Sequence, residues 1–367
     1  MRFRVRPGLE ELPAYSPGKP IEELKRETGA DPITKLASNE NPLGPPAAAV
    51  AAIAWASAEV HRYPDALAHE LRSVISDRTG LSPSCISLGN GSDELIQVIA
   101  LALIEKGCES VVPYPSFPRY ETATQIAGGK TVRVPLAADY SIDLDAVVRA
   151  VNEKTRAIWL ANPNNPTGTL FDRQTFDRFL AKIPSDVAVI LDEAYHDFAK
   201  GDETPDAADY VKAGTNVIGM RTFSKTYGLA GLRIGYAFCE EPLCSLLNRI
   251  RGPFNINSVA QAAAVAALRD SEYLKESLAQ NRHAIARLHS ILKKHGFTTT
   301  PSHANFVWAD LGKPAKSLCD ALLLQGVIVR SGDIFGCPNC VRVSTGTDEQ
   351  LDHLDQALAA ATMGVSV

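Results

Sequence analysis

Several features that mark whole classes of protein are missing from this sequence. Its 367 residues contain no apolar run long enough to cross a bilayer, and the richest stretch, residues 47–58, is short and has the small-residue character of a buried helix. The formal net charge of −5 gives no basic excess for binding nucleic acid. The basic N-terminus has no apolar core behind it, unlike a secretory signal. We therefore expect a cytoplasmic protein with neither a membrane nor a nucleic-acid partner.

Cysteine is too scattered for a disulfide framework. The seven cysteines, an odd number in a chain of this size, are typical of a reducing compartment. One pair, Cys337 and Cys340, has the spacing of a metal or redox motif. A zinc site would need two further ligands at matched spacing, and none is nearby, while a strand-like run follows where a redox motif would open a helix. We interpret the pair as incidental and expect no metal.

What the sequence does contain is a regular alternation of strands and helices. Short apolar runs typical of strands occur at residues 86–88, 110–113, 130–134, 157–160, 187–191, 217–220 and 234–238, with helical segments between several of them. Such alternation predicts an α/β fold in which a mostly parallel seven-stranded sheet is sandwiched by helices.

The pattern changes beyond Phe254. Long helical patterns are followed by short strands at residues 306–309, 327–330 and 341–344, with further helices at 316–324 and 348–361. A chain of 367 residues exceeds the usual size of a single core. We therefore expect an N-terminal arm with part of a small domain at residues 1–45, a large domain at 46–270, and a smaller α+β domain at 271–367.

The strongest local motif surrounds Lys225. It begins where a strand ends, at the carboxyl edge of the sheet, which is where ligands bind in such folds. Lys225 offers an amine nucleophile for an aldehyde, Thr222 and Ser224 offer hydroxyls, and Arg233 offers a guanidinium that grips phosphate. The alternative is an ordinary surface lysine in a glycine-bearing turn.

Polar residues follow the preceding strands as well. Asp192 ends an apolar strand, and a buried carboxylate there is costly without a cation such as a protonated pyridine nitrogen. Tyr195 and Asn165, which follow two different strands, could hydrogen-bond a ring oxygen. The alternatives are a helix N-cap for Asp192 and no more than a tight Asn-Pro loop around Asn165.

Two further places could hold anions. The turn Gly91-Ser92-Asp93 opens a helix whose backbone N–H groups suit a phosphate, although Ser and Asp also cap many helices. Arg342 lies on the buried phase of a strand and needs an anionic partner, which is a substrate group or a structural carboxylate. Phe117 follows another strand and could stack on an aromatic cofactor, or simply belong to the core.

These residues, in this order, resemble the fold-type I aminotransferases of class II, which depend on pyridoxal 5'-phosphate. The match covers nearly the whole chain. It is carried by Asn39-Glu-Asn-Pro, Tyr63-Pro, Gly91-Ser-Asp-Glu, Asn165-Pro-Thr-Gly, Asp192-Glu-Ala-Tyr195, Ser224-Lys225 and Leu232-Arg233-Ile-Gly. Within that class, the chain is similar to the histidinol-phosphate aminotransferases at Tyr15-Ser-Pro-Gly-Lys-Pro, Asn305-Phe-Val, Gly326-Val-Ile-Val-Arg330 and Val341-Arg-Val-Ser-Thr-Gly-Thr.

The resemblance implies a role for each residue. Lys225 would carry the cofactor as a Schiff base and move the proton, while Asp192 would pair with the ring nitrogen. The phenolic oxygen would be contacted by Asn165 and Tyr195, and Phe117 would stack on the ring. The cofactor phosphate would be held by Gly91, Ser92, Asp93, Thr222, Ser224 and Arg233, with Tyr63 reaching the cofactor of the other subunit of a homodimer. The substrate would be bound by Tyr15, Asn41, Arg330 and Arg342.

The implied reaction is transfer of an amino group between L-histidinol phosphate and 2-oxoglutarate, giving imidazole acetol phosphate and glutamate in histidine biosynthesis. Aromatic amino-acid aminotransferases share this scaffold and most of these motifs, so they are an alternative. A phosphothreonine decarboxylase, which would release carbon dioxide, is a further one. A non-enzymatic module derived from such an enzyme would lack the lysine, the acid or a phosphate ligand, and none is missing here.

Overall fold

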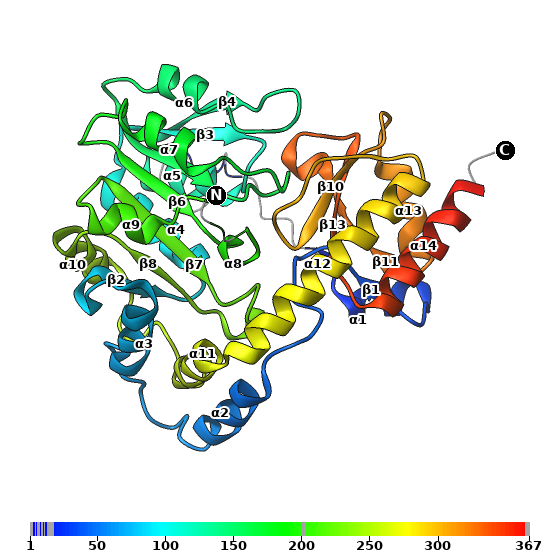
Figure 1. The fold of residues 1–367 in the computed structure, drawn as a ribbon, viewed down its shortest axis with the longest axis horizontal. Coiled ribbons are helices and arrows are strands. Elements are labelled where there is room, and N and C mark those ends of the chain that lie inside the picture. Colours follow the sequence, from blue (N-terminus) through cyan, green and yellow to red (C-terminus); the bar gives the residue numbers. More distant parts are fainter. Residues whose placement is uncertain are drawn as a thin grey trace.

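The structure is a computed structural model that describes residues 3, 5, 8, 10, 12, 18–199, 201 and 203–363. Its main feature is a seven-stranded sheet of order β2-β8-β7-β6-β5-β3-β4 (Figure 1). The strands are β2 (Ile86–Gly89), β3 (Glu109–Tyr114), β4 (Lys130–Pro135), β5 (Thr155–Ala161), β6 (Ala188–Asp192), β7 (Val217–Thr222) and β8 (Gly235–Phe238). In this sheet β8 runs antiparallel to β2 and β7, and the other neighbouring strands pair in parallel. The expected seven-stranded, mostly parallel sheet is therefore confirmed.

Both faces of this sheet are buried, as its nearly continuous apolar strands predict. Within β5, Trp159 packs in one apolar cluster while Ile158 and Leu160 pack in another on the opposite face, because successive side chains of a strand alternate. The Trp159 face is covered by α4 (Ser92–Leu103), α5 (Arg119–Ala127) and α10 (Glu241–Ile250). The other face is covered by α3 (His69–Thr79), α6 (Leu144–Ala150), α7 (Arg173–Leu180), α9 (Ala207–Lys212) and α11 (Ser258–Arg269).

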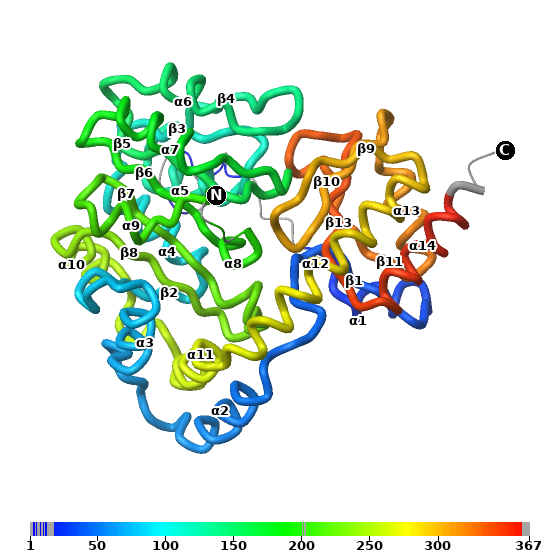
Figure 2. Tube along the Cα trace, viewed as in Figure 1, coloured from blue at the N-terminus to red at the C-terminus, as the bar shows by residue number. Residues whose placement is uncertain are grey.

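A smaller α+β part lies beside the large sheet, and α12 (Ser271–Lys294) extends from one to the other (Figure 1). It contains an antiparallel sheet of order β12-β13-β10-β9 and a parallel pair, β1-β11. The tube in Figure 2 shows the N-terminal α1 lying among the C-terminal elements. The elements are α1 (Ile21–Thr28), β1 (Thr34–Lys35), β9 (Thr298–Thr299), β10 (Phe306–Asp310), α13 (Lys316–Leu324), β11 (Val327–Ile328), β12 (Arg330–Ser331), β13 (Cys340–Ser344) and α14 (Asp348–Met363).

Two expectations were wrong. The single strand expected at residues 327–330 is split, because β11 pairs with β1 while β12 pairs with β13. The helix expected to be buried, α2 (Ala47–Ser57), buries only Ala49 and Ala56. Its small residues pack closely on α11 from one side, whereas Val50 and Trp55 are 50% and 76% exposed.

Within the described part of the chain, none of the helices combines the length and the hydropathy needed to cross a membrane. All seven cysteines, including Cys337 and Cys340, are free.

Candidate active site

A cavity of about 540 Å³ lies at the carboxyl ends of β5, β6 and β7, where the large sheet meets the smaller part. Parallel strands bring the residues that follow them to one edge, so residues distant in the sequence meet there. Twelve of the expected site residues line this cavity: Ser92, Asp93, Phe117, Asn165, Asp192, Tyr195, Thr222, Ser224, Lys225, Arg233, Arg330 and Arg342.

Lys225 follows β7 and projects into the cavity. Its Nζ donates to the carbonyl oxygen of Ser38 at 3.4 Å and lies 5.8 Å from the centre of the Tyr195 ring. Burial lowers the pKa of this amine to about 8, and the positive charges of Arg342 and Arg233 act in the same direction. With this pKa, roughly a tenth of the amine is uncharged at pH 7, far more than for an ordinary lysine, and the uncharged form is the nucleophile for an aldehyde.

Asp192 ends β6 on the floor of the cavity. Its carboxylate accepts hydrogen bonds from the Tyr120 hydroxyl at 2.6 Å and from the Ala194 backbone N–H at 3.0 Å. Burial raises the pKa of Asp192 to about 6, although both hydrogen bonds oppose the shift. The alternative of a helix N-cap does not hold, because α8 (His196–Ala199) begins beyond the Ala194 amide that Asp192 binds.

Tyr120 is a site residue that the sequence reasoning missed. It is buried in α5, stacks on Trp159 with ring centres 5.2 Å apart, and presents its hydroxyl to Asp192. A tyrosine on the buried face of a helix needs a partner for its hydroxyl, which was the available signal. The ring of Phe117 packs against the Tyr120 ring in a T-shaped arrangement, with ring centres 5.7 Å apart, and Phe117 lines the cavity.

One end of the cavity is built to bind an anion. Gly91 precedes α4 with a positive φ of 76°, and a Cβ added there would lie 2.5 Å from Nη2 of Arg233. Only glycine therefore allows the guanidinium to approach the first turn of α4 so closely. The hydroxyl-bearing Thr222 and Ser224 are buried beside it, and the Ser224 N–H donates to the Thr222 Oγ1 at 3.2 Å. A helix N-terminus, two hydroxyls and a guanidinium together suit a phosphate.

The opposite side of the cavity is formed by Arg342 of β13. Its Nη1 donates to Oδ1 of Asn165 at 2.6 Å, and its Nη2 donates to the carbonyl oxygen of Ala37 at 2.7 Å. The guanidinium also lies near the rings of Phe306 and Phe335, at 5.4 and 5.7 Å. The acceptors of these two hydrogen bonds are neutral oxygens, and a guanidinium in this place suits an anionic group of a ligand.

Tyr195 lines the cavity as expected, but Asn39 and not Asn41 lies beside it there. The Tyr195 hydroxyl accepts a hydrogen bond from Nδ2 of Asn39 at 2.9 Å, and Asn39 lines the cavity. Asn41, which we expected at the substrate, does not line it. Its side-chain amide donates instead to the Thr226 carbonyl oxygen at 2.9 Å and to Ser277 Oγ at 2.8 Å, so it fixes the backbone behind the site.

One other expected residue is not brought to the cavity. Tyr63 is 82% exposed and stacks on Phe254, with ring centres 4.7 Å apart. Tyr15 lies outside the described residues.

The comparison with known proteins decides the family. A model of aminotransferase class I and II matches residues 31–358. The chain belongs to this family. This aminotransferase is 46% identical over 347 residues to a protein of Carboxydothermus hydrogenoformans named histidinol-phosphate aminotransferase 2, covering 94% of this chain and 96% of the relative. It is 42% identical over 350 residues to the histidinol-phosphate aminotransferase of Caldicellulosiruptor saccharolyticus, covering 95% and 98%.

A solved structure gives the same result for the fold. The histidinol-phosphate aminotransferase of Sinorhizobium meliloti, in complex with pyridoxal 5'-phosphate, is similar to this aminotransferase with a TM-score of 0.91 and 32% identity, covering 99% of this chain and 98% of that one. The expected family and fold type are therefore confirmed.

Proposed function

We propose that this aminotransferase uses pyridoxal 5'-phosphate to transfer an amino group between L-histidinol phosphate and 2-oxoglutarate, giving imidazole acetol phosphate and glutamate. The observation that carries the proposal is one cavity in which the amine of Lys225 faces the carboxylate of Asp192, with Arg233 and Arg342 both among its lining residues. The names of the relatives support the choice of substrate.

The residues present fit the cofactor. The anion-binding end at Gly91, Ser92, Asp93, Thr222, Ser224 and Arg233 suits its phosphate, and the carboxylate of Asp192 suits its ring nitrogen. Phe117 would stack on the ring, while Asn165 and Tyr195 would donate to its phenolic oxygen. When bound, pyridoxal phosphate supplies an electrophilic carbon and an electron sink for the substrate's α-carbon.

The side chains then divide the work. Lys225, with its lowered pKa, can take a proton at one carbon and return it at another, which a permanently charged amine could not do. Asp192 would pair its carboxylate with the protonated ring nitrogen of the cofactor and so stabilise the positive charge there. Arg342, with Arg330 and Tyr15, binds the substrate phosphate in one half-reaction and a carboxylate in the other, which a bidentate guanidinium permits. Two half-reactions in one site imply ping-pong kinetics.

Amino-donor profiling tests the substrate. We expect the purified holoenzyme to form glutamate from 2-oxoglutarate with a larger kcat/KM for histidinol phosphate than for phenylalanine or tyrosine. The reason is that Arg330 and Arg342 line the cavity where the phosphate of the amino donor would lie. Arg342→Lys, which keeps the charge but loses the fork, should lower kcat/KM for histidinol phosphate by about 10²-fold. A preference for tyrosine would replace the proposed substrate with an aromatic amino acid. Release of carbon dioxide from phosphothreonine without formation of glutamate would indicate a decarboxylase.

We also propose a homodimer in which Tyr63 reaches the partner's cofactor phosphate. The surface of the segment 50–67 supports it, because five of its large apolar side chains are exposed: Val50, Trp55, Val60, Tyr63 and Leu67. In the dimer, the second subunit would also cover the side of α2 that the rest of this chain leaves exposed.

The dimer gives a second prediction. Sedimentation of the native protein should give twice the chain mass of 39.5 kDa, and Trp55→Glu should shift it toward the monomer by placing a charge in the interface. Leu324→Glu is the matched control, since Leu324 is 70% exposed at the end of α13, away from this surface. A native protein that sediments as a monomer would exclude the dimer and the role of Tyr63.

We further propose the domain division at residues 1–45, 46–270 and 271–367, and a cytoplasmic location. The division is supported by the pairing of β1 with β11 and by the packing of α2 on α11. The seven free cysteines support a reducing compartment.

A further inference from the structure

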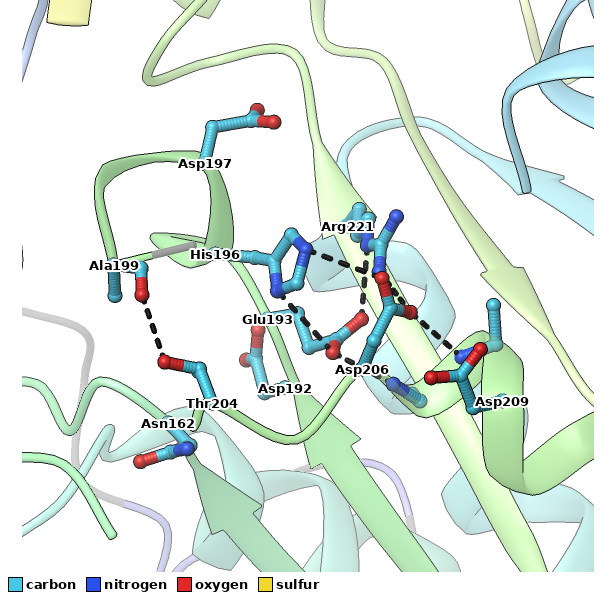
Figure 3. Close-up of polar contacts among 12 residues, drawn as sticks. Asn162, Asp192, Glu193, His196, Asp197, Ala199, Thr204, Asp206, Asp209 and Arg221 are labelled. Atoms are coloured by element: carbon cyan, nitrogen blue, oxygen red, sulfur yellow. Dashed lines mark hydrogen bonds and ion pairs between the residues drawn. The ribbon is translucent and has the colours of Figure 1, made fainter. Parts of the chain in front are cut away.

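A second group of charged side chains lies directly behind the cavity. We call Glu193, His196, Asp206 and Arg221 the ion cluster. They converge from the residue after β6, from α8, from the N-cap of α9 and from β7 (Figure 3). Arg221 joins two acids: its Nε donates to Glu193 Oε2 at 2.8 Å and its Nη2 donates to Asp206 Oδ1 at 2.7 Å. The His196 ring lies between the same acids, with Nδ1 3.5 Å from Glu193 Oε1 and Nε2 3.4 Å from Asp206 Oδ2.

The ion cluster is attached to the cavity through neighbouring residues of two strands. Asp192 is the last residue of β6 and Glu193 follows it, while Arg221 and Thr222 are the last two residues of β7. Successive side chains of a strand point to opposite faces. Asp192 and Thr222 therefore face the cavity, while Glu193 and Arg221 meet on the far side. The Glu193 N–H also donates to the Met220 carbonyl oxygen at 2.8 Å, which fixes the two strand ends to each other.

Other contacts make this group rigid. Glu193 Oε1 accepts from the Ala207 N–H at 2.8 Å, and Asp206 caps α9 by accepting from the Ala208 N–H at 2.9 Å. The guanidinium of Arg221 lies 5.2 Å from the ring centre of Phe238 in β8. The side chains of Glu193 and Arg221 are only 1% and 12% exposed. A rearrangement of either would therefore move the ends of β6 and β7.

Glu193, His196 and Asp206 have the residue types of a metal site. Arg221 already lies between their two carboxylates at hydrogen-bond distance, so a guanidinium supplies the positive charge that a metal would bring. Buried ion pairs contribute little net stability, because desolvation offsets their attraction. Their use is to hold one geometry, and here the geometry is that of two strand ends.

We propose that the ion cluster is the positioning unit of the active site, in which Arg221 bridges Glu193 and Asp206 and thereby fixes Asp192 and Thr222 for the cofactor's ring nitrogen and phosphate. The inference rests on the proposed function, because it assigns the cluster to cofactor binding. The four residues of the ion cluster would act through Asp192 and Thr222, without touching the cofactor themselves.

Arg221→Lys tests the proposal, because lysine keeps the charge but cannot bridge two carboxylates with a planar fork. We expect the dissociation constant for pyridoxal phosphate to rise about tenfold, in the range found when residues behind a ligand are changed. The pH midpoint of the bound cofactor's visible absorbance should move, and the rise in Tm caused by the cofactor should shrink. The matched control is Arg287→Lys, since Arg287 also joins two acids, Asp348 and Asp352, far from the cavity.

The outcomes separate the two proposals. If the native protein does not bind pyridoxal phosphate, the proposed function fails. If it binds, and Arg221→Lys lowers the Tm of the apo and holo forms equally with unchanged affinity and absorbance midpoint, the cluster is structural only and this inference fails. Should Arg221→Lys not fold, Asp206→Asn removes one charge of the bridge while asparagine still caps α9, and the same shifts in affinity and midpoint are expected. Values equal to those of the native protein would overturn the inference.

Discussion

Lys225→Ala should reduce kcat for transamination by about 10⁴-fold or more, because it removes both the amine that holds the cofactor and the group that moves the proton. The variant should still bind pyridoxal phosphate through the anion-binding end at Arg233, but without the visible absorbance of a covalent link to the protein. Absorbance spectra and single-turnover kinetics with histidinol phosphate measure the two effects separately. A variant that keeps the native absorbance band would contradict the assignment of Lys225.

Two comparisons strengthen this test. Lys212→Ala is the control, because Lys212 is a partly exposed lysine of α9 paired with Asp209 and should have native activity. In the native apoenzyme, capture of the cofactor should accelerate as the pH rises through about 8, since the uncharged fraction of the Lys225 amine grows there. A capture rate that is flat across this range would show that the amine is not limiting.

Asp192→Asn should lower kcat by about 10²- to 10³-fold, which is the usual cost of removing one preorganised electrostatic partner from an active site. Asparagine can still accept the Tyr120 hydrogen bond at this position, so the fold should persist, but it carries no charge to hold a protonated ring nitrogen. The measurement is kcat with the cofactor saturating. An activity within a factor of about two of the native value would exclude an essential charge at Asp192, given the expected range.

The pH dependence of cofactor binding distinguishes the charge from the shape. The pKa of Asp192 is raised to about 6 by burial, so the carboxylate takes up a proton as the pH falls through that value. Native affinity for pyridoxal phosphate should therefore decrease below about pH 6, whereas Asp192→Asn should lack this limb. Asp310→Asn is the control, because Asp310 also accepts a tyrosine hydroxyl, from Tyr140 at 3.1 Å, and lies in β10 outside the cavity.

The large sheet and most of its ligand edge could be predicted because they depend on local patterns. Apolar runs indicate the strands. Asp192 ends one strand, and Asn165 and Lys225 come shortly after two others, so parallel pairing brings them to one edge. The roles given to these residues stay predictions until the variants above are measured.

The rest depends on packing between distant segments. Tyr120 reaches Asp192 only because α5 packs on the face of the sheet that carries Trp159. Asn39 and Asn41 look equivalent in the sequence, but the backbone at Asn39 has a φ of 55° and only its side chain faces the cavity. The exposure of α2 was missed because apolar composition does not tell whether a helix packs on its own chain or on another.

The cavity also has a consequence for how the chain matures. The carbonyl oxygens of Ala37 and Ser38 accept hydrogen bonds from Arg342 and Lys225, so the site contains residues from near both ends of the chain. During synthesis, the pocket for the cofactor can therefore be complete only after β13 has been made and has docked. A ligand that binds only the finished fold stabilises it by mass action, by about 2.7 kcal/mol at a concentration 100 times its dissociation constant. The supply of the vitamin-derived cofactor would then govern how long each molecule survives, as well as how fast it works.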